Sequence, residues 1–326
     1  MRKNRLGYTD LDLSVIGLGA WAMGGPWKYG WSNQDDGDSI SAIHSALDEG
    51  INWIDTAHVY GFGHSEEVVG RALEGRREGV IVATKCGMLR ESPTSDAPVF
   101  SLKRDSVRRE CEGSLKRLKI DVIDLYQIHW PNPEAEIEEA WEELIRLKDE
   151  SKVRHIGVCN FSVAQLERCQ KMHPVASLQP PYSMLRRDIE GAQQPWCLGN
   201  HCGIVAYSPM QHGLLTGKVT RAWVDALPAD DFRRNYSADF REPKLTAHLN
   251  LVDGLRAIAA AHGATVGQVA VAWTLRGDRI TSAIVGARTP AQVRENARAA
   301  EVRLSDGDVA QIEALLEQHA REIASA

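Results

Sequence analysis

The stretch Gly17-Leu18-Gly19-Ala20-Trp21-Ala22 decides between two folds that the rest of the chain allows, an open doubly wound α/β sheet and a closed α/β barrel. It follows a short apolar run and matches the loose pattern G-x-G-x-x-A, in which a helix must begin at once so that its N-terminal amides meet a pyrophosphate. Here the chain continues through Gly24, Gly25, Pro26 and Gly30, which cannot open a helix. We therefore reject a dinucleotide-binding turn of an open sheet at this position and expect a wide, Trp-rich loop over an active site.

Outside this stretch, short apolar runs alternate with longer amphipathic segments. Continuous β-branched runs bounded by turns indicate strands buried on both faces, and the alternation indicates parallel pairing. The predicted strands are 15–18, 51–55, 80–84, 122–129, 155–158, 177–179, 203–207 and 282–285. The predicted helices are 39–49, 66–73, 103–118, 134–148, 163–171, 249–262, 266–275, 291–299 and 306–320.

Eight such units can close into a barrel. We predict an α/β protein with a (β/α)8 TIM barrel, preceded by an N-terminal β-hairpin at 4–14 and followed by an accessory C-terminal helix. No Ser/Gly-rich or Pro-rich linker interrupts the pattern, so residues 1–326 are expected to form a single domain.

Composition limits the partners. Lys+Arg 38 against Asp+Glu 44 gives a net charge of −6, which offers no electrostatic attraction to nucleic acid or to an anionic membrane. The sequence shows no membrane span and no apolar signal segment at its start. We expect a cytoplasmic protein whose partner is a small molecule, and the sequence does not indicate an oligomeric state.

The six cysteines form no C-x-x-C pair and no regular framework, which is typical of reduced, packed thiols. Cys197 and Cys202 flank His201, but this spacing matches no zinc pattern, so no metal is predicted.

Four polar residues stand where predicted strands end. Asp55 closes the run 51–55 and leads to Tyr60, Lys85 follows the run 80–84, and His129 ends the run 122–129. The C-terminal ends of barrel strands form the catalytic face, so these residues should converge there. Reduction of a carbonyl without a metal needs a neutral proton donor, and a tyrosine can serve when a lysine, itself held by a carboxylate, lowers its pKa. Taken singly, each residue also has an ordinary structural explanation, such as a helix cap or a packed side chain.

Several motifs resemble the aldo-keto reductase family, in family order and over nearly the whole chain. They are Asp55-Thr56-Ala57-x-x-Tyr60-Gly61 with Glu66, Thr84-Lys85, Asp124-Leu125-Tyr126-Gln127-Ile128-His129, Gly157-Val158-Cys159-Asn160-Phe161, Ala206-Tyr207-Ser208-Pro209-Met210, Gly213-Leu214-Leu215-Thr216-Gly217-Lys218, and Gly286-Ala287-Arg288-x-x-x-Gln292-x-x-Glu295-Asn296. The chain looks similar to the bacterial-type NADPH-dependent members, near the general-stress enzymes and the potassium-channel β-subunits.

The resemblance implies an NAD(P)H-dependent reductase of an aldehyde or ketone. It makes Tyr60 the general acid, Lys85 the residue that lowers its pKa, Asp55 the partner of Lys85, and His129 the residue that orients the carbonyl. It also implies a cofactor extended across the barrel mouth. The residues implied for the cofactor are Asn160 and Gln179 at the carboxamide, Tyr207 on the nicotinamide ring, Ser208, Pro209, Leu214, Thr216, Gly217 and Lys218 near the pyrophosphate, and Gly286, Arg288, Gln292, Glu295 and Asn296 toward the adenosine.

Two positions depart from the family pattern. Cys159 stands where many members have serine, which replaces a hydroxyl near the carboxamide by a weaker thiol donor. Gly286 and Gln292 stand where some branches place basic residues for the 2′-phosphate of NADPH, which leaves Arg288 as the candidate. We therefore expect NADPH in preference to NADH.

The substrate pocket is expected to be lined by Trp21, Trp31 and Trp130, with Trp27 as a further candidate. Aromatic walls suit apolar aldehydes and also stack on sugars, and the polar neighbours His58, His64 and Asn33 leave a sugar carbonyl open. The Arg-, Asp- and Pro-rich stretch 219–245 is either a flap over the cofactor or a plain surface loop.

Two rival functions stay open at this stage. One is a cofactor-binding regulatory protein of the same fold with weak turnover. The other is a barrel hydrolase with paired carboxylates, such as Asp55 with Glu66 or Asp124, but this leaves the Tyr60 and Lys85 pair unexplained.

Overall fold

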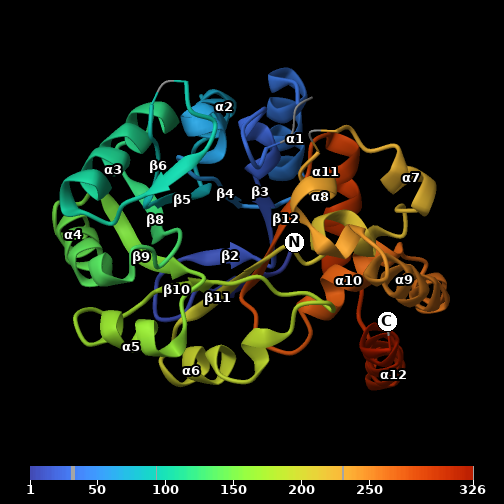
Figure 1. The fold of residues 1–326 in the computed structure, drawn as a ribbon. Helices are drawn as coiled ribbons and strands as arrows, with labels where there is room; N and C mark the ends of the chain where they lie inside the picture. The colour runs from blue at the N-terminus through green and yellow to red at the C-terminus, as the bar shows by residue number, and fades with distance from the viewer. Residues whose placement is uncertain (31–33, 93, 230, 326) are drawn as a thin grey trace.

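In a computed structural model, which describes residues 1–30, 34–92, 94–229 and 231–325, the eight predicted strands close into one parallel barrel (Figure 1). Each strand pairs with the next in the chain, and the last pairs with the first through Ala283 opposite Ile16. The (β/α)8 prediction is confirmed. The barrel strands are β3 (Ile16–Gly19), β4 (Trp53–Asp55), β5 (Ile81–Cys86), β8 (Ile123–Ile128), β9 (Val153–Cys159), β10 (Ser177–Gln179), β11 (Gly203–Tyr207) and β12 (Ser282–Gly286).

Helices surround the barrel, and most of them lie where the sequence predicts (Figure 1). The Ser162 and Thr289 hydroxyls cap two of them by accepting from the backbone amides of Gln165 and Gln292. The short α6, which contains Pro195, was not predicted. The helices of the ring are α1 (Asp36–Asp48), α2 (His64–Ala72), α3 (Arg104–Leu118), α4 (Ile137–Asp149), α5 (Val163–Gln170), α6 (Gln193–Gly199), α9 (Lys244–Ala261), α10 (Val266–Thr274), α11 (Pro290–Ala297) and the accessory α12 (Asp306–Ala324).

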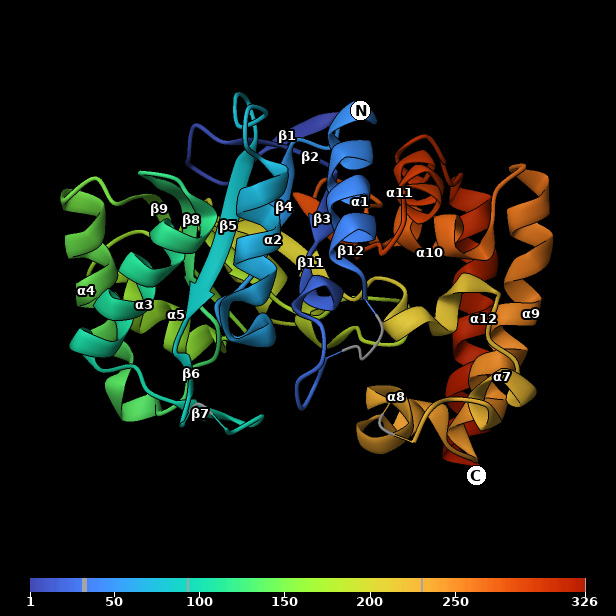
Figure 2. The ribbon, with the colours of Figure 1, turned by 90° about the horizontal axis from the view of Figure 1, so that it is seen from above.

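The predicted N-terminal hairpin closes one end of the barrel. Its strands β1 (Lys3–Arg5) and β2 (Asp12–Ser14) pair antiparallel. Leu6, Leu11 and Leu13 are buried and pack with Trp53 inside the barrel. The hairpin lies at the opposite end of the barrel from α8 (Phe232–Tyr236), so the other end is left for a site (Figure 2).

The Gly17 position has a packing explanation. The buried Trp53 indole donates a hydrogen bond to the Ser14 carbonyl at 3.1 Å and another to the Ser282 hydroxyl at 3.0 Å, which holds the ring against β3. A Cβ at Gly17 would lie 2.1 Å from Trp53 Cε2. This glycine therefore makes room for an indole, in agreement with the rejection of a phosphate-binding turn.

Two segments at the open end differ from the expected pattern. The hairpin of β6 (Met88–Arg90) and β7 (Pro98–Phe100) was not predicted. The stretch 219–245 contains α7 (Arg221–Asp225) and α8 beside a 3-10 turn. The 3-10 turns are η1 (Trp21–Gly24), η2 (Tyr60–Gly63), η3 (Glu134–Glu136), η4 (Asp188–Glu190), η5 (Gln211–Thr216), η6 (Ala238–Phe240) and η7 (Arg298–Ala300).

Two further observations concern the whole described chain. All six cysteines are free and buried, as expected of packed thiols. A search of the described residues finds no helix with the length and apolar character that crossing a membrane requires.

Candidate active site

Strand register brings the four predicted catalytic residues to one edge of the barrel. Asp55 on β4 pairs with Ala83 on β5, and Lys85 lies two residues further along the same face. Lys85 pairs with Gln127 on β8, and His129 directly follows that strand. Residues that are 74 positions apart in the sequence (55 to 129) therefore face one space.

Lys85 is completely buried and fully engaged. Its Nζ donates to Asp55 Oδ2 at 2.6 Å and to the Thr56 carbonyl at 2.8 Å, and lies 3.3 Å from Tyr60 Oη. Burial alone would lower the pKa of Lys85, but Asp55 and then Tyr60 outweigh it, and the net pKa is raised. A permanent ammonium therefore stands beside the tyrosine hydroxyl.

The backbone around Tyr60 is fixed by close packing. The Tyr60 amide donates to the Ala57 carbonyl at 3.1 Å, and the turn at Gly24 lies against it. A Cβ at Gly24 would lie 2.6 Å from the Tyr60 carbonyl carbon, and one at Gly61 would lie 2.0 Å from the Gly24 oxygen. The glycine-rich loop after β3 thus positions the tyrosine.

Burial and Lys85 act on the pKa of Tyr60 in opposite directions. Burial raises it, Lys85 lowers it, and the net effect is a pKa of about 12. Lys85 lowers the pKa of Tyr60, which is the direction expected of it, but desolvation of the phenolate by burial is the larger effect. Tyr60 is consequently neutral at physiological pH, with the cation that would stabilise its anion 3.3 Å away.

His129 lies across the cavity from Tyr60. The two ring centroids are 5.8 Å apart in an edge-on arrangement. Burial, and then the charge of Lys85, hold the pKa of His129 well below its ordinary value. The imidazole is therefore neutral near pH 7, so it offers a hydrogen bond but no imidazolium proton.

A cavity of about 610 Å³ opens at these residues and extends past the ends of β9, β10 and β11. Gln179 donates to Asp55 Oδ1 at 2.8 Å, Asn160 donates to the His129 carbonyl at 3.0 Å, and Tyr207 donates to Asn160 Oδ1 at 2.9 Å. These hydrogen bonds connect Gln179, Asn160 and Tyr207 of the cavity lining to Asp55 and His129, and they fix the position of the Tyr207 ring.

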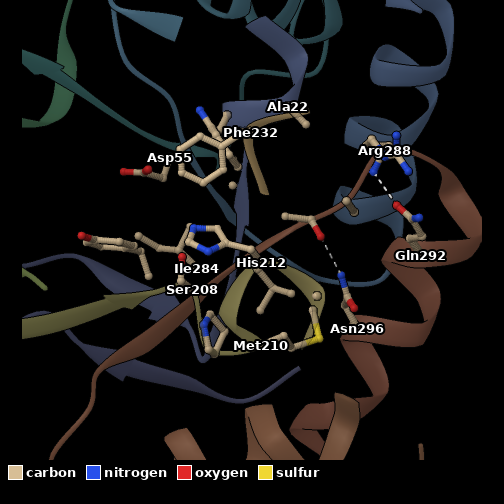
Figure 3. A pocket seen from close by; sticks show the side chains of 18 of the residues that line it. Ala22, Asp55, Ser208, Met210, His212, Phe232, Ile284, Arg288, Gln292 and Asn296 are labelled. Atoms are coloured by element: carbon tan, nitrogen blue, oxygen red, sulfur yellow. Dashed lines mark hydrogen bonds between the residues drawn. The ribbon is translucent and has the colours of Figure 1, made fainter. Parts of the chain in front are cut away.

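The far end of the cavity lies between the loop after β11 and helix α11 (Figure 3). Lys218 and Glu295 form an ion pair of 2.6 Å between these two walls. The Gln292 side chain accepts from the Arg288 amide, and Asn296 donates to the Gly286 carbonyl (Figure 3). An elongated cavity with amides and an aromatic ring at one end and cations at the other fits an extended nicotinamide dinucleotide.

Most of the residues expected to bind cofactor line this cavity, but two do not. Leu214 is fully buried and packs against Val219, Phe240 and Leu245. Gly217 ends the turn η5 in a left-handed conformation outside the cavity lining.

Only some of the residues expected to contact substrate line the cavity. Trp21, Trp27 and Trp130 line the cavity, whereas Trp31 and Asn33 lie outside the described residues. The other two polar candidates are turned to other partners. Arg117 donates to His58 at 3.0 Å, and His64 is bonded to Asp36 at 2.8 Å, so neither faces the cavity.

Sequence reasoning missed several cavity residues. Met88 and Phe100 come from the β6–β7 hairpin, which has no clear periodicity. Phe232 and Arg233 of α8 also line the cavity, so the 219–245 stretch does extend over it. The aromatic residues of this largely polar stretch, among them Phe232, were the available signal. His212 also lines the cavity and was not predicted.

The carboxylates needed by the hydrolase alternative are engaged elsewhere. Glu66 accepts from Thr84 and Arg117, and Asp124 accepts from Arg77 and Arg154. In the described part of the chain no three His, Cys, Asp or Glu side chains are grouped to hold a metal ion. Glu66 and Asp124 are therefore not placed as the second carboxylate that the hydrolase alternative requires.

The barrel and its cavity at the carboxyl ends of the strands define a (β/α)8 barrel protein with its site at the usual face. The chain belongs to the aldo/keto reductase family, whose model matches residues 15–317. It is 37% identical over 321 residues to aldo-keto reductase YhdN of Bacillus subtilis, covering 97% of this chain and 94% of the relative.

Two further relatives have more specific names. The NADH-specific methylglyoxal reductase of Escherichia coli is 36% identical over 321 residues, with 94% of this chain and 96% of the relative covered. A solved glycerol dehydrogenase of Gluconobacter oxydans superposes with a TM-score of 0.88 at 38% identity, covering 97% of this chain and 95% of that one. Members of this family use nicotinamide cofactors.

Proposed function

We propose that the protein is an NADPH-dependent reductase of small aldehydes or sugar carbonyls, with Tyr60 as its general acid. The observation that carries the proposal is the buried contact of Lys85 with both Asp55, at 2.6 Å, and Tyr60, at 3.3 Å. A lysine that is buried and paired in this way has little reason to contact a tyrosine hydroxyl of the cavity lining unless its charge is used there.

The proposed chemistry assigns one task to each side chain. A reduced nicotinamide, when bound, supplies the hydride. Tyr60 gives its hydroxyl proton to the carbonyl oxygen, and the Lys85 ammonium stabilises the resulting phenolate. Asp55 holds the ammonium in place, and neutral His129 hydrogen-bonds the carbonyl oxygen and so orients the substrate.

Other residues would position the cofactor. Asn160 and Gln179 suit the carboxamide, and Tyr207 suits the ring face. Their side chains have little freedom, because Gln179 is bonded to Asp55, Asn160 to the His129 carbonyl and Tyr207 to Asn160. Arg288 at the far end of the cavity suits a 2′-phosphate, since guanidinium matches the fork of phosphate oxygens. Because the E. coli relative is NADH-specific, the preference for NADPH over NADH has to be tested by measuring the binding of both cofactors.

The first test compares Tyr60→Phe with wild type by following NADPH absorbance over a panel of aldehydes. We expect turnover by wild type and a loss of roughly 100-fold or more in the variant, the usual contribution of a positioned general acid. Cofactor binding, read by fluorescence quenching, should be unchanged. Tyr29→Phe, which removes another hydroxyl from the same cavity wall, is the matched control and should stay within about threefold of wild type. Binding of NADPH without any turnover would favour a regulatory protein, and binding of neither cofactor would refute the proposal.

The second test concerns cofactor choice. Arg288→Gln removes one cation from the far end of the cavity. We expect the Kd for NADPH to rise about tenfold or more, which is the loss of one charge-assisted phosphate contact, while the Kd for NADH stays within about twofold. Equal Kd values of wild type for the two cofactors would remove the case for NADPH.

A further inference from the structure

The aromatic side chains at the catalytic end of the cavity form a continuous series of ring contacts. The Trp27 centroid is 6.3 Å from that of Tyr60 and 5.5 Å from that of Tyr29. Tyr29 lies 6.3 Å from Phe232, which in turn lies 5.5 Å from Trp21. All five line the cavity, so an aromatic wall runs from the proposed proton donor to helix α8.

His212 is the polar member of this wall. Its ring centroid is 5.4 Å from Phe232 and 6.1 Å from Trp21, and Figure 3 shows it beside Phe232 in the cavity. The backbone φ is 54° at His212, 45° at Gln211 and 98° at Gly213, so three successive residues are left-handed. Such conformations are costly for non-glycine residues and persist where the surroundings hold them, often at ligand sites.

The imidazole of His212 is neutral. Burial lowers its pKa, as do the charges of Arg233 on α8 and of Arg186, and Asp239 of η6 opposes them only in part. Nδ1 is covered by protein and has no hydrogen-bond partner among the described residues. Because His212 lines the cavity, Nε2 is the ring nitrogen left to face a ligand. A buried N–H without a partner is rarer than a buried acceptor without one, so the proton belongs on Nε2. His212 therefore presents one N–H donor from an aromatic wall.

We infer that His212 is a substrate-specificity residue, whose Nε2–H binds a second oxygen on the substrate. Aromatic rings accept the carbon skeleton of many aldehydes, but a plain alkyl aldehyde leaves this donor without a partner, which is unfavourable in a water-poor site. A hydroxyl or second carbonyl carried by the substrate supplies the acceptor. The inference rests on the proposed reductase function and narrows its substrates to carbonyl compounds that carry a hydroxyl or a second carbonyl, of which the 2-hydroxy aldehydes are the smallest.

The experiment compares kcat/KM for 2-hydroxypropanal and for propanal, two substrates that differ by one hydroxyl. In His212→Phe we expect the ratio of the two values to fall about tenfold, the loss of one hydrogen bond, with propanal changed less than about threefold. Phe232→Leu disturbs the same wall but keeps the donor, so its ratio should equal that of wild type. His212→Gly tolerates the left-handed backbone and also removes the donor, so the same fall is expected there if His212→Phe does not fold.

A second readout separates the substrate from the cofactor. The Kd for NADPH, measured by fluorescence quenching, should stay within about twofold in both His212 variants. A weaker Kd together with equal losses on the two aldehydes would place His212 at the cofactor and overturn the inference, as would an unchanged ratio. A wild type that binds NADPH but reduces no aldehyde would instead contradict the proposed function on which this inference rests.

Discussion

The pairing of Asp55 with Lys85 should appear as a large coupling energy in the stability of the protein. Both side chains are almost completely excluded from solvent, with exposed fractions of 5% and 0%, and their charged atoms are 2.6 Å apart. At an effective dielectric constant of about 20, two unit charges at this distance attract by about 6 kcal/mol. Desolvation offsets part of this, and removing one partner of such a pair usually costs about 3–5 kcal/mol because the other charge is left alone.

We therefore expect Asp55→Asn and Lys85→Met each to lower the free energy of unfolding by about 3–5 kcal/mol. The double variant should lose less than the sum of the two by about 2 kcal/mol or more, since no isolated charge remains. Urea unfolding, followed by tryptophan fluorescence and far-UV circular dichroism, measures all four proteins. All three variants should also lose reductase activity. Losses that add within about 0.5 kcal/mol would show that the two charges are not coupled, and the account of Lys85 given above would then be refuted.

Two further predictions concern the scaffold. Gly17→Ala should destabilise the protein by about 1–3 kcal/mol, because its Cβ would overlap Trp53, while Gly191→Ala, which has open space and a helical backbone, should change thermal stability by less than about 0.5 kcal/mol. The pKa of His58 is lowered to about 4, mainly by burial and then by the charge of Arg117, whereas in the unfolded chain it is near 6.5. Protonation therefore favours the unfolded chain, so the stability that neutral His58 contributes is present above pH 6.5 and is lost as the pH falls toward 4. His58→Asn keeps an acceptor for Arg117 and should therefore lose about 1–2 kcal/mol less than wild type between pH 7.5 and pH 5 in urea unfolding, whereas identical losses would show that His58 is not the group responsible.

The order of strands and helices could be predicted because each barrel strand is buried on both faces and so leaves a continuous apolar run. Residues that directly end a strand, such as Asp55, Lys85 and His129, inherit their position from that pattern. Residues in irregular segments could not be placed in this way. Phe100 and Phe232 reach the cavity through a hairpin and a short helix whose courses depend on tertiary contacts, and His58 was misjudged because Arg117 lies 59 positions away in the sequence.

Residues with a left-handed backbone occur in both the proposed cofactor region and the proposed substrate region of the site. Asn160 and Ser208 stand directly after β9 and β11 and have φ values of 64° and 56°, and His212 lies four residues further along the chain. A left-handed residue at the end of a strand turns the chain sharply, so its side chain and the next amides face the barrel mouth instead of following the strand. Strain of this kind persists only where the surrounding structure fixes it, and here hydrogen bonds to the His129 carbonyl and from the Tyr207 hydroxyl fix Asn160. The residues proposed to hold the cofactor and those proposed to choose the substrate are thus positioned by the same structural feature, left-handed turns at the ends of barrel strands or in the loops that follow them.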